Sequence, residues 1–142
     1  MRISLFIIIL FFLSNISFAS QDTNGLQLID PWVRQAPPTA KNLAGYGELK
    51  NNSDKVIEVL SITSGLFEKV EMHITTFENG MMKMAEVENM MLKPGESVYF
   101  EPGGRHFMLI KPNTAIKAGL IVPVKILLKT GQVLNFDMMV RR

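Results

Sequence analysis

The sequence predicts an all-β domain, an antiparallel β-sandwich or barrel, from three observations. Its apolar runs are short and either alternate with polar residues or are rich in β-branched residues. They lie between clusters of Gly, Pro, Asn and Asp that favour turns. No segment keeps the 3.6-residue periodicity of an amphipathic helix. With 142 residues, 47% of them apolar, the chain is long enough for one domain with its own core, which we expect over residues 20–142.

The first nineteen residues have the three-part pattern of a secretory signal peptide. Arg2 supplies the positive charge, Leu5–Leu13 is an unbroken apolar run, and Ser17 and Ala19 are the small residues before a cleavage site. Nine apolar residues are too few to span a bilayer, which takes about 20. We therefore expect residues 1–19 to be removed and the mature protein to be exported and soluble, the alternative being an uncleaved anchor. Because the chain has no cysteine, we expect no lipid at the cleavage site.

Three strands are predicted before residue 63, and each follows or precedes a turn signal. Residues 26–30 alternate and stop before Pro31, which lacks the N–H that a sheet ladder requires. Residues 45–50 run into Asn51–Asp54, whose composition is typical of a turn. Residues 56–62 are rich in β-branched side chains.

A hairpin is predicted next, and it contains the first candidate functional residue. Residues 67–76 alternate, so His73 lies on the opposite face from Met72. Asn79-Gly80 tolerates the two positive φ angles of a type I′ turn, and Met81–Val87 is the returning strand. Four further strands follow between Pro and Gly turns: 97–100, 106–110, 122–129 and 133–140.

The composition and motifs favour no enzyme class. The chain has no Gly-rich phosphate loop, no Gly-x-Ser-x-Gly elbow and no His-Glu-x-x-His pair. Its lack of cysteine excludes thiol catalysis and thiolate metal sites, including the blue-copper type. A net charge of +2 is too small to indicate a nucleic-acid partner.

Two histidines and two methionines form the candidate site. His106 and Met108 are two apart, so on a strand both side chains point to one face with Cα atoms about 7 Å apart. Met84 lies on the strand that folds back beside His73, so these two can approach across the hairpin, although the sequence does not fix their register. The spacing is His73-x10-Met84-x21-His106-x-Met108. Neutral thioether and imidazole donors suit Cu(I) and are poor for Zn²⁺ or Mg²⁺. The alternative is that these are surface histidines beside core methionines.

This spacing is the metal-binding signature of the PCu(A)C periplasmic copper chaperones, and the sequence resembles that family over nearly its whole mature length. Further stretches agree with the family: Asp30–Arg34, Glu71–His73, Asn79–Met84, Pro102–Leu109 and the closing hairpin. The resemblance implies a cupredoxin-like antiparallel β-sandwich of Greek-key type that binds one Cu(I) through His73, Met84, His106 and Met108. It also implies delivery of copper to the Cu(A) centre of cytochrome c oxidase subunit II, or to an oxidase copper-assembly protein, by a protein that we expect to be monomeric.

Two departures from the family pattern are visible. The residue after His73 is Ile74, where the family can have methionine, so we treat the preceding Met72 only as a reserve ligand. The chain stops at Arg142 without the His/Met-rich tail of some members, so we expect no additional copper there. To Trp32 and Arg34 we assign a structural role. Glu71 either orients His73 or is a solvated strand charge.

The sequence leaves two rival functions open beside the non-enzymatic Cu(I) carrier. One is a periplasmic copper storage or resistance protein with the same site and no dedicated oxidase acceptor. The other is a β-sandwich interaction module that binds no metal and uses its methionines as core.

Overall fold

A computed structural model describes residues 25–142, and every regular element in that part of the chain is a β-strand. The strands are β1 (Leu26–Arg34), β2 (Asn42–Asn51), β3 (Ile57–Thr63), β4 (Phe67–Glu78), β5 (Met81–Glu86), β6 (Met90–Leu92), β7 (Ser97–Phe100), β8 (Arg105–Pro112), β9 (Ile121–Leu128) and β10 (Val133–Arg141). The all-β prediction is confirmed. The predicted signal peptide, residues 1–19, lies outside the described residues. Within residues 25–142, no helix has the length and apolar content needed to cross a membrane.

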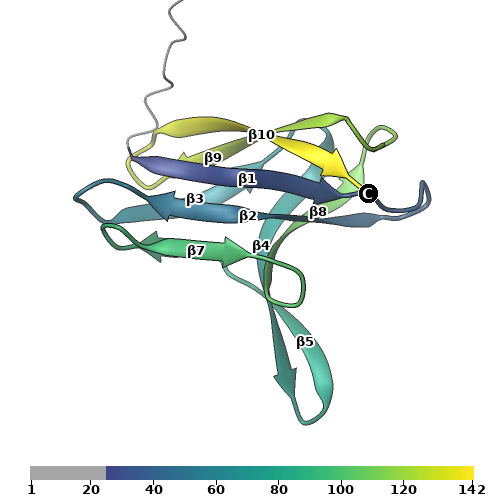
Figure 1. Cartoon of the computed structure of the whole chain (residues 1–142), viewed down its shortest axis with the longest axis horizontal. Coiled ribbons are helices and arrows are strands. Elements are labelled where there is room, and N and C mark those ends of the chain that lie inside the picture. Colours follow the sequence, from purple (N-terminus) through teal and green to yellow (C-terminus); the bar gives the residue numbers. More distant parts are fainter. Residues whose placement is uncertain (1–24) are drawn as a thin grey trace, which may run out of the picture.

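The strands form one sheet that closes on itself like a barrel. Their order is β5-β4-β8-β7-β2-β1-β10-β9-β3-β6, and an additional pairing of β3 with β4 joins the two sides (Figure 1). Most neighbours are antiparallel, whereas β1–β10 and β7–β8 are parallel. The finer assignment to a cupredoxin-like sandwich of Greek-key type stays a prediction.

Alternating side chains fill the interior of this closed sheet. Along β9 the residues Val122, Val124, Ile126 and Leu128 are buried, and exposed or half-buried residues lie between them. On β8, Phe107 and Leu109 are almost fully buried, and the Phe107 ring stacks on Phe100 with centroids 3.9 Å apart. Because strand side chains alternate, this inward position of Phe107 and Leu109 directs His106 and Met108 to the outer face.

The first strand is longer than predicted, because β1 continues past Pro31 to Arg34. A register shift between Ile29 and Trp32 marks a bulge, and within it Asp30 has a φ of 45°. Gly47 of β2 faces this bulge: a Cβ there would lie 3.2 Å from the Ile29 carbonyl oxygen. The bulge accommodates Pro31, which cannot donate a ladder hydrogen bond, and the strand continues because its pairing with β2 resumes at Trp32.

An ion pair ties this bulge to the last strand, and it gives a prediction for acid stability. Arg141 donates two hydrogen bonds to the Asp30 carboxylate and holds the pKa of that carboxyl below its usual value. A lowered pKa in the folded state contributes stability above the ordinary carboxyl pKa, and this stability is lost as the pH falls through the lowered value. We expect Asp30→Asn, which also tolerates positive φ, to lower the urea midpoint at pH 7 by a small amount. The difference from wild type should shrink as the pH falls from 7 and should vanish once the Asp30 carboxyl is protonated in the folded wild type. A difference that stays constant over this range would contradict the assignment.

The hairpin of β4 and β5 projects beyond the rest of the sheet (Figure 1). Its turn has Asn79 at φ 52° and Gly80 at φ 75°, the two positive angles predicted for a type I′ turn. Glu78 pairs with Met81 across the turn, which fixes the register of the whole hairpin. All six residues of β5 are exposed, so this hairpin carries its side chains into solvent.

Candidate metal centre

The two histidines of the chain lie directly opposite each other on neighbouring strands. His73 of β4 pairs with His106 of β8, and the ring centroids are 5.6 Å apart with the planes inclined by 54°. A metal–imidazole bond is roughly 2 Å long. Rings at this separation can therefore both reach one ion placed between them. Both rings are shielded, since the His73 side chain is 14% exposed and His106 is 6% exposed.

The two predicted methionine donors lie on the same outer face as the histidines. Met108 is half-buried and two residues after His106 on β8, opposite Glu71. Met84 of β5 pairs with Thr75, whereas the residue opposite His73 is Glu86. Met84 is therefore diagonal to His73 on the shared face, a spacing that a long side chain can bridge. Its side chain is 56% exposed. The four predicted residues thus occupy one face of three adjacent strands, β5, β4 and β8.

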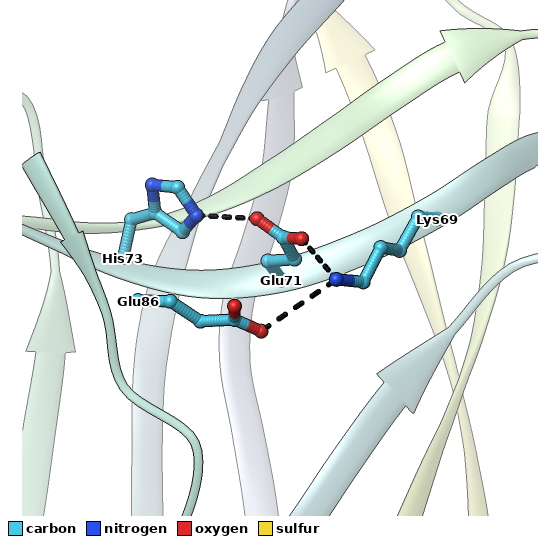
Figure 2. A network of polar contacts seen from close by, with 4 residues as sticks. All are labelled: Lys69, Glu71, His73 and Glu86. Carbon is cyan, nitrogen blue, oxygen red and sulfur yellow. Dashed lines mark hydrogen bonds and ion pairs between the residues drawn. The ribbon is translucent and has the colours of Figure 1, made fainter.

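A hydrogen-bonded row of charged side chains positions one of the rings. Figure 2 shows Lys69, Glu71 and His73 in sequence, with Glu86 beside Lys69. His73 Nε2 lies 2.6 Å from Glu71 Oε2. Because an ionised carboxylate only accepts, Nε2 carries the proton and donates it. The Lys69 ammonium, and after it the His73 ring, keep the pKa of Glu71 below its ordinary value. Glu71 is therefore a fixed anionic partner of His73, and its side chain is only 13% exposed.

In a neutral ring, this hydrogen bond leaves the other ring nitrogen of His73, Nδ1, without a proton and with its lone pair available. With the proton on Nε2, a neutral imidazole has an unprotonated Nδ1. Nδ1 of His73 is buried and has no hydrogen-bond partner, alone among the buried side-chain nitrogens and oxygens of residues 25–142. A buried acceptor without a partner costs free energy, and a metal ion bound at Nδ1 would satisfy it. On the other ring, His106 Nδ1 lies 3.3 Å from the Gly104 carbonyl oxygen.

Met72 cannot serve as the reserve ligand that the sequence suggested. It is 4% exposed, belongs to the hydrophobic core and pairs with Phe107. Adjacent residues of a strand point to opposite faces, so Met72 points into the barrel when His73 points out. Of the residues described, no three or more His, Cys, Asp and Glu are grouped so that they could hold a metal. The candidate donors are thus the histidine pair together with thioethers.

The structural role assigned to Trp32 and Arg34 agrees with an aromatic layer on the outside of the sheet. Trp32 pairs with Tyr46, and their ring centroids are 4.8 Å apart. The Arg34 guanidinium lies over both rings, 5.9 Å from the centroid of Trp32 and 5.7 Å from that of Tyr46. Trp32 is half-buried here and is not in the barrel interior.

Curated sequences similar to this chain come from two bacteria. "Uncharacterized protein RP573" of Rickettsia prowazekii is 31% identical over an alignment of 117 residues that covers 75% of this chain and 65% of that protein. "Putative lipoprotein Lxx21020" of Leifsonia xyli is 27% identical over 112 residues, covering 78% of this chain and 66% of the relative. This chain therefore spans slightly less than two thirds of the length of each relative.

Solved structures with the same fold include PCuAC domains with and without copper. A copper-bound PCuAC domain from PmoF2 has a TM-score of 0.68 and 19% identity, with 82% of this chain and 92% of that domain covered. An apo PCuAC domain from PmoF1 has a TM-score of 0.69, 18% identity and coverages of 82% and 93%. The solution structure of CuI-DR1885 from Deinococcus radiodurans has a TM-score of 0.62, 23% identity and coverages of 84% and 81%.

A family model supplies the assignment that these fold similarities leave open. The model described as "Putative lipoprotein LpqE-like" matches residues 26–140, from the first residue of β1 to one residue before the end of β10. The chain therefore belongs to the LpqE-like family, which is the family of the PCuAC domains.

Proposed function

We propose that this protein is an exported copper carrier, not an enzyme, that binds one Cu(I) through His73, Met84, His106 and Met108. The observation that carries the proposal is the histidine pair, 5.6 Å apart, with the buried and unpartnered Nδ1 of His73. Copper-bound relatives of the same fold support it, one of them described as a Cu(I) form.

The donor set explains the choice of metal. Thioether sulfur is soft and neutral, so it favours Cu(I) over Zn²⁺ and Mg²⁺. Four neutral donors would leave the complex with a single positive charge, which is less costly to shield from water than a divalent ion. The adjacent Glu71 carboxylate supplies a compensating negative charge through the protonated side of His73.

The unequal exposure of the donors fits a protein that passes its metal on. His106 is buried, and Met108, two residues further along β8, is half-buried. Met84 on the projecting hairpin, by contrast, is 56% exposed. A partner can replace an exposed, weak thioether first while the histidines still hold the ion. We propose that the acceptor is the Cu(A) centre of cytochrome c oxidase subunit II or a copper-assembly protein of the oxidase. The signal-like N-terminus and the family description as a lipoprotein support the periplasm as the location of this exchange.

The proposal is tested by anaerobic titration with Cu(I) in the presence of a chromogenic chelator that competes for the ion. We expect one Cu(I) per chain, with Zn²⁺ unable to displace it. Mixing the loaded protein with the apo soluble domain of oxidase subunit II should transfer copper. Absence of Cu(I) binding would overturn the proposal, and tight binding without transfer would favour the storage function instead.

Glu71 provides a separate prediction, because it fixes the ring whose free nitrogen would bind the ion. Removing a hydrogen-bonding partner of a metal-binding histidine commonly costs about 10- to 100-fold in metal affinity. We expect Glu71→Gln, which keeps the shape but loses the charge, to weaken Cu(I) binding by about tenfold in the competition assay. Glu68→Gln is the control, since Glu68 is exposed on the same strand and pairs only with Lys111 in the described structure. Equal affinities for the two variants would show that Glu71 does not position His73.

A further inference from the structure

The hairpin next to the proposed copper site presents a second exposed thioether on the same face. Met82 pairs with Phe77, two positions further along the hairpin from the Met84–Thr75 pair. Because strand side chains alternate, Met82 and Met84 share the face of His73, and their Cα atoms are about 7 Å apart. Met81, by contrast, points to the reverse face.

The two faces of the hairpin differ in chemistry. The reverse face carries the ion pair of Lys83 with Glu78, whose Nζ and Oε2 atoms are 2.8 Å apart. On the face of His73, the charged residues Glu71 and Glu86 lie at or behind His73, whereas the part between His73 and the turn carries Thr75, Phe77, Met82 and Met84, none of them charged. A cation approaching from the turn along this face therefore meets only neutral groups, two of them soft sulfur donors, until it reaches the level of His73 and Glu86.

Exposure makes Met82 available to such an ion. Met82 is 63% exposed, Met84 is 56% exposed and Phe77 is 72% exposed. Three of the other methionines of the described chain, Met72, Met90 and Met138, are buried in the core. Packing thus accounts for those three residues and does not account for Met82.

We propose that Met82 is an entry ligand that binds incoming Cu(I) together with Met84 and hands it to the site formed by His73, Met84, His106 and Met108. Met84 is shared by both positions, so the ion moves by exchanging one donor at a time: a bond to Met82 breaks as a bond to a histidine forms. The copper stays Cu(I) throughout and no electron is transferred. This inference rests on the proposed function, since it concerns how the same site is filled and emptied.

An entry ligand changes rates without changing the equilibrium. Because uptake and release follow the same path in opposite directions, losing Met82 slows both by the same factor. The dissociation constant, which is their ratio, then stays constant. This separates an entry ligand from a fifth permanent donor, whose loss would weaken binding.

The experiment compares Met82→Leu with Met81→Leu and Met91→Leu. Leucine keeps the apolar character and removes the sulfur. Met81 is 62% exposed on the reverse face of the same hairpin, and Met91 is 66% exposed on β6, so both are matched controls. Each protein is loaded with one Cu(I) anaerobically. Release into excess bathocuproine disulfonate is then followed by absorbance, at chelator concentrations where the rate no longer depends on the chelator. The affinity is measured with the same chelator at equilibrium.

We expect Met82→Leu to release Cu(I) at least about fivefold more slowly than wild type, with an affinity within about twofold of it. Both controls should match wild type in rate and affinity. A wild-type release rate for Met82→Leu, an equal slowing in Met81→Leu, or a loss of affinity in Met82→Leu would each overturn the entry role while leaving the copper site standing. If wild type itself holds no Cu(I), the proposed function fails and this inference fails with it.

Discussion

Replacing His106 and Met108 together by alanine is expected to lower the affinity for Cu(I) by at least about 100-fold, more than the loss of a residue that only supports a ligand. The double substitution removes two of the four proposed donors from one strand and leaves His73 without the ring that faces it at 5.6 Å. The measurement is the anaerobic competition titration, in which the variant should leave nearly all the copper with the chelator.

A second variant guards against loss of the fold, because His106 is only 6% exposed and its removal opens a space beside the sheet. Met84→Leu changes an exposed residue and keeps its bulk, so it should leave the urea midpoint unaltered. We expect it to weaken Cu(I) binding by about tenfold. Met91→Ala, an exposed methionine on β6, is the control and should bind like wild type. If the double variant of His106 and Met108 bound one Cu(I) at wild-type affinity, the site assignment would be wrong.

Local sequence signals predicted most strands and failed where backbone geometry compensated for a residue that disfavours a strand. The alternation of β9 and the Asn79-Gly80 turn depend only on residues that are close in sequence, so both could be predicted. Pro31 indicated a strand end, yet the bulge at Asp30 carries β1 on to Arg34. The three-residue strand β6 was not predicted, because so short a segment has no periodicity and is defined by its pairing with β3.

The candidate site divides in the same way between local and long-range information. His106 and Met108 could be placed on one face from strand alternation alone. That His73 lies opposite His106 depends on β4 pairing with β8, which joins segments more than thirty residues apart, and no single-sequence signal reports it. The register of the hairpin was left open in the sequence, whereas the tight turn sets Met84 opposite Thr75 and Glu86 opposite His73. The exclusion of Met72 could have been drawn from alternation, since neighbouring residues of a strand cannot share a face.

The sequence left open whether Glu71 orients His73 or is a solvated charge, and burial decides between the two. Its side chain is 13% exposed and is held between Lys69 and His73. An i, i+2 spacing on a strand was compatible with both alternatives. Only the side-chain positions show that the carboxylate lies within hydrogen-bond distance of Nε2 of the ring.

Phe107→Ala is expected to destabilise the fold by about 3 to 5 kcal/mol, the usual range for removing a buried aromatic ring. Phe107 is 1% exposed and stacks on Phe100, with ring centroids 3.9 Å apart. A domain of this kind is stable by about 5 to 15 kcal/mol in total, so the variant should unfold at a much lower urea concentration. The measurement is urea unfolding followed by circular dichroism.

The same substitution at Phe77 is the matched control for this prediction. Phe77 is 72% exposed on the hairpin, so Phe77→Ala should change the stability by no more than about 0.5 kcal/mol. Equal effects of the two substitutions would contradict the position of Phe107 in the core. Since Phe107 lies between His106 and Met108 on β8, its inward anchoring is what holds those two side chains outward. The proposed Cu(I) site exists only in the folded state, so adding Cu(I) should recover part of the stability lost in Phe107→Ala. Because the variant holds His106 and Met108 less firmly, we expect it to bind Cu(I) more weakly and to gain less stability from the ion than wild type does.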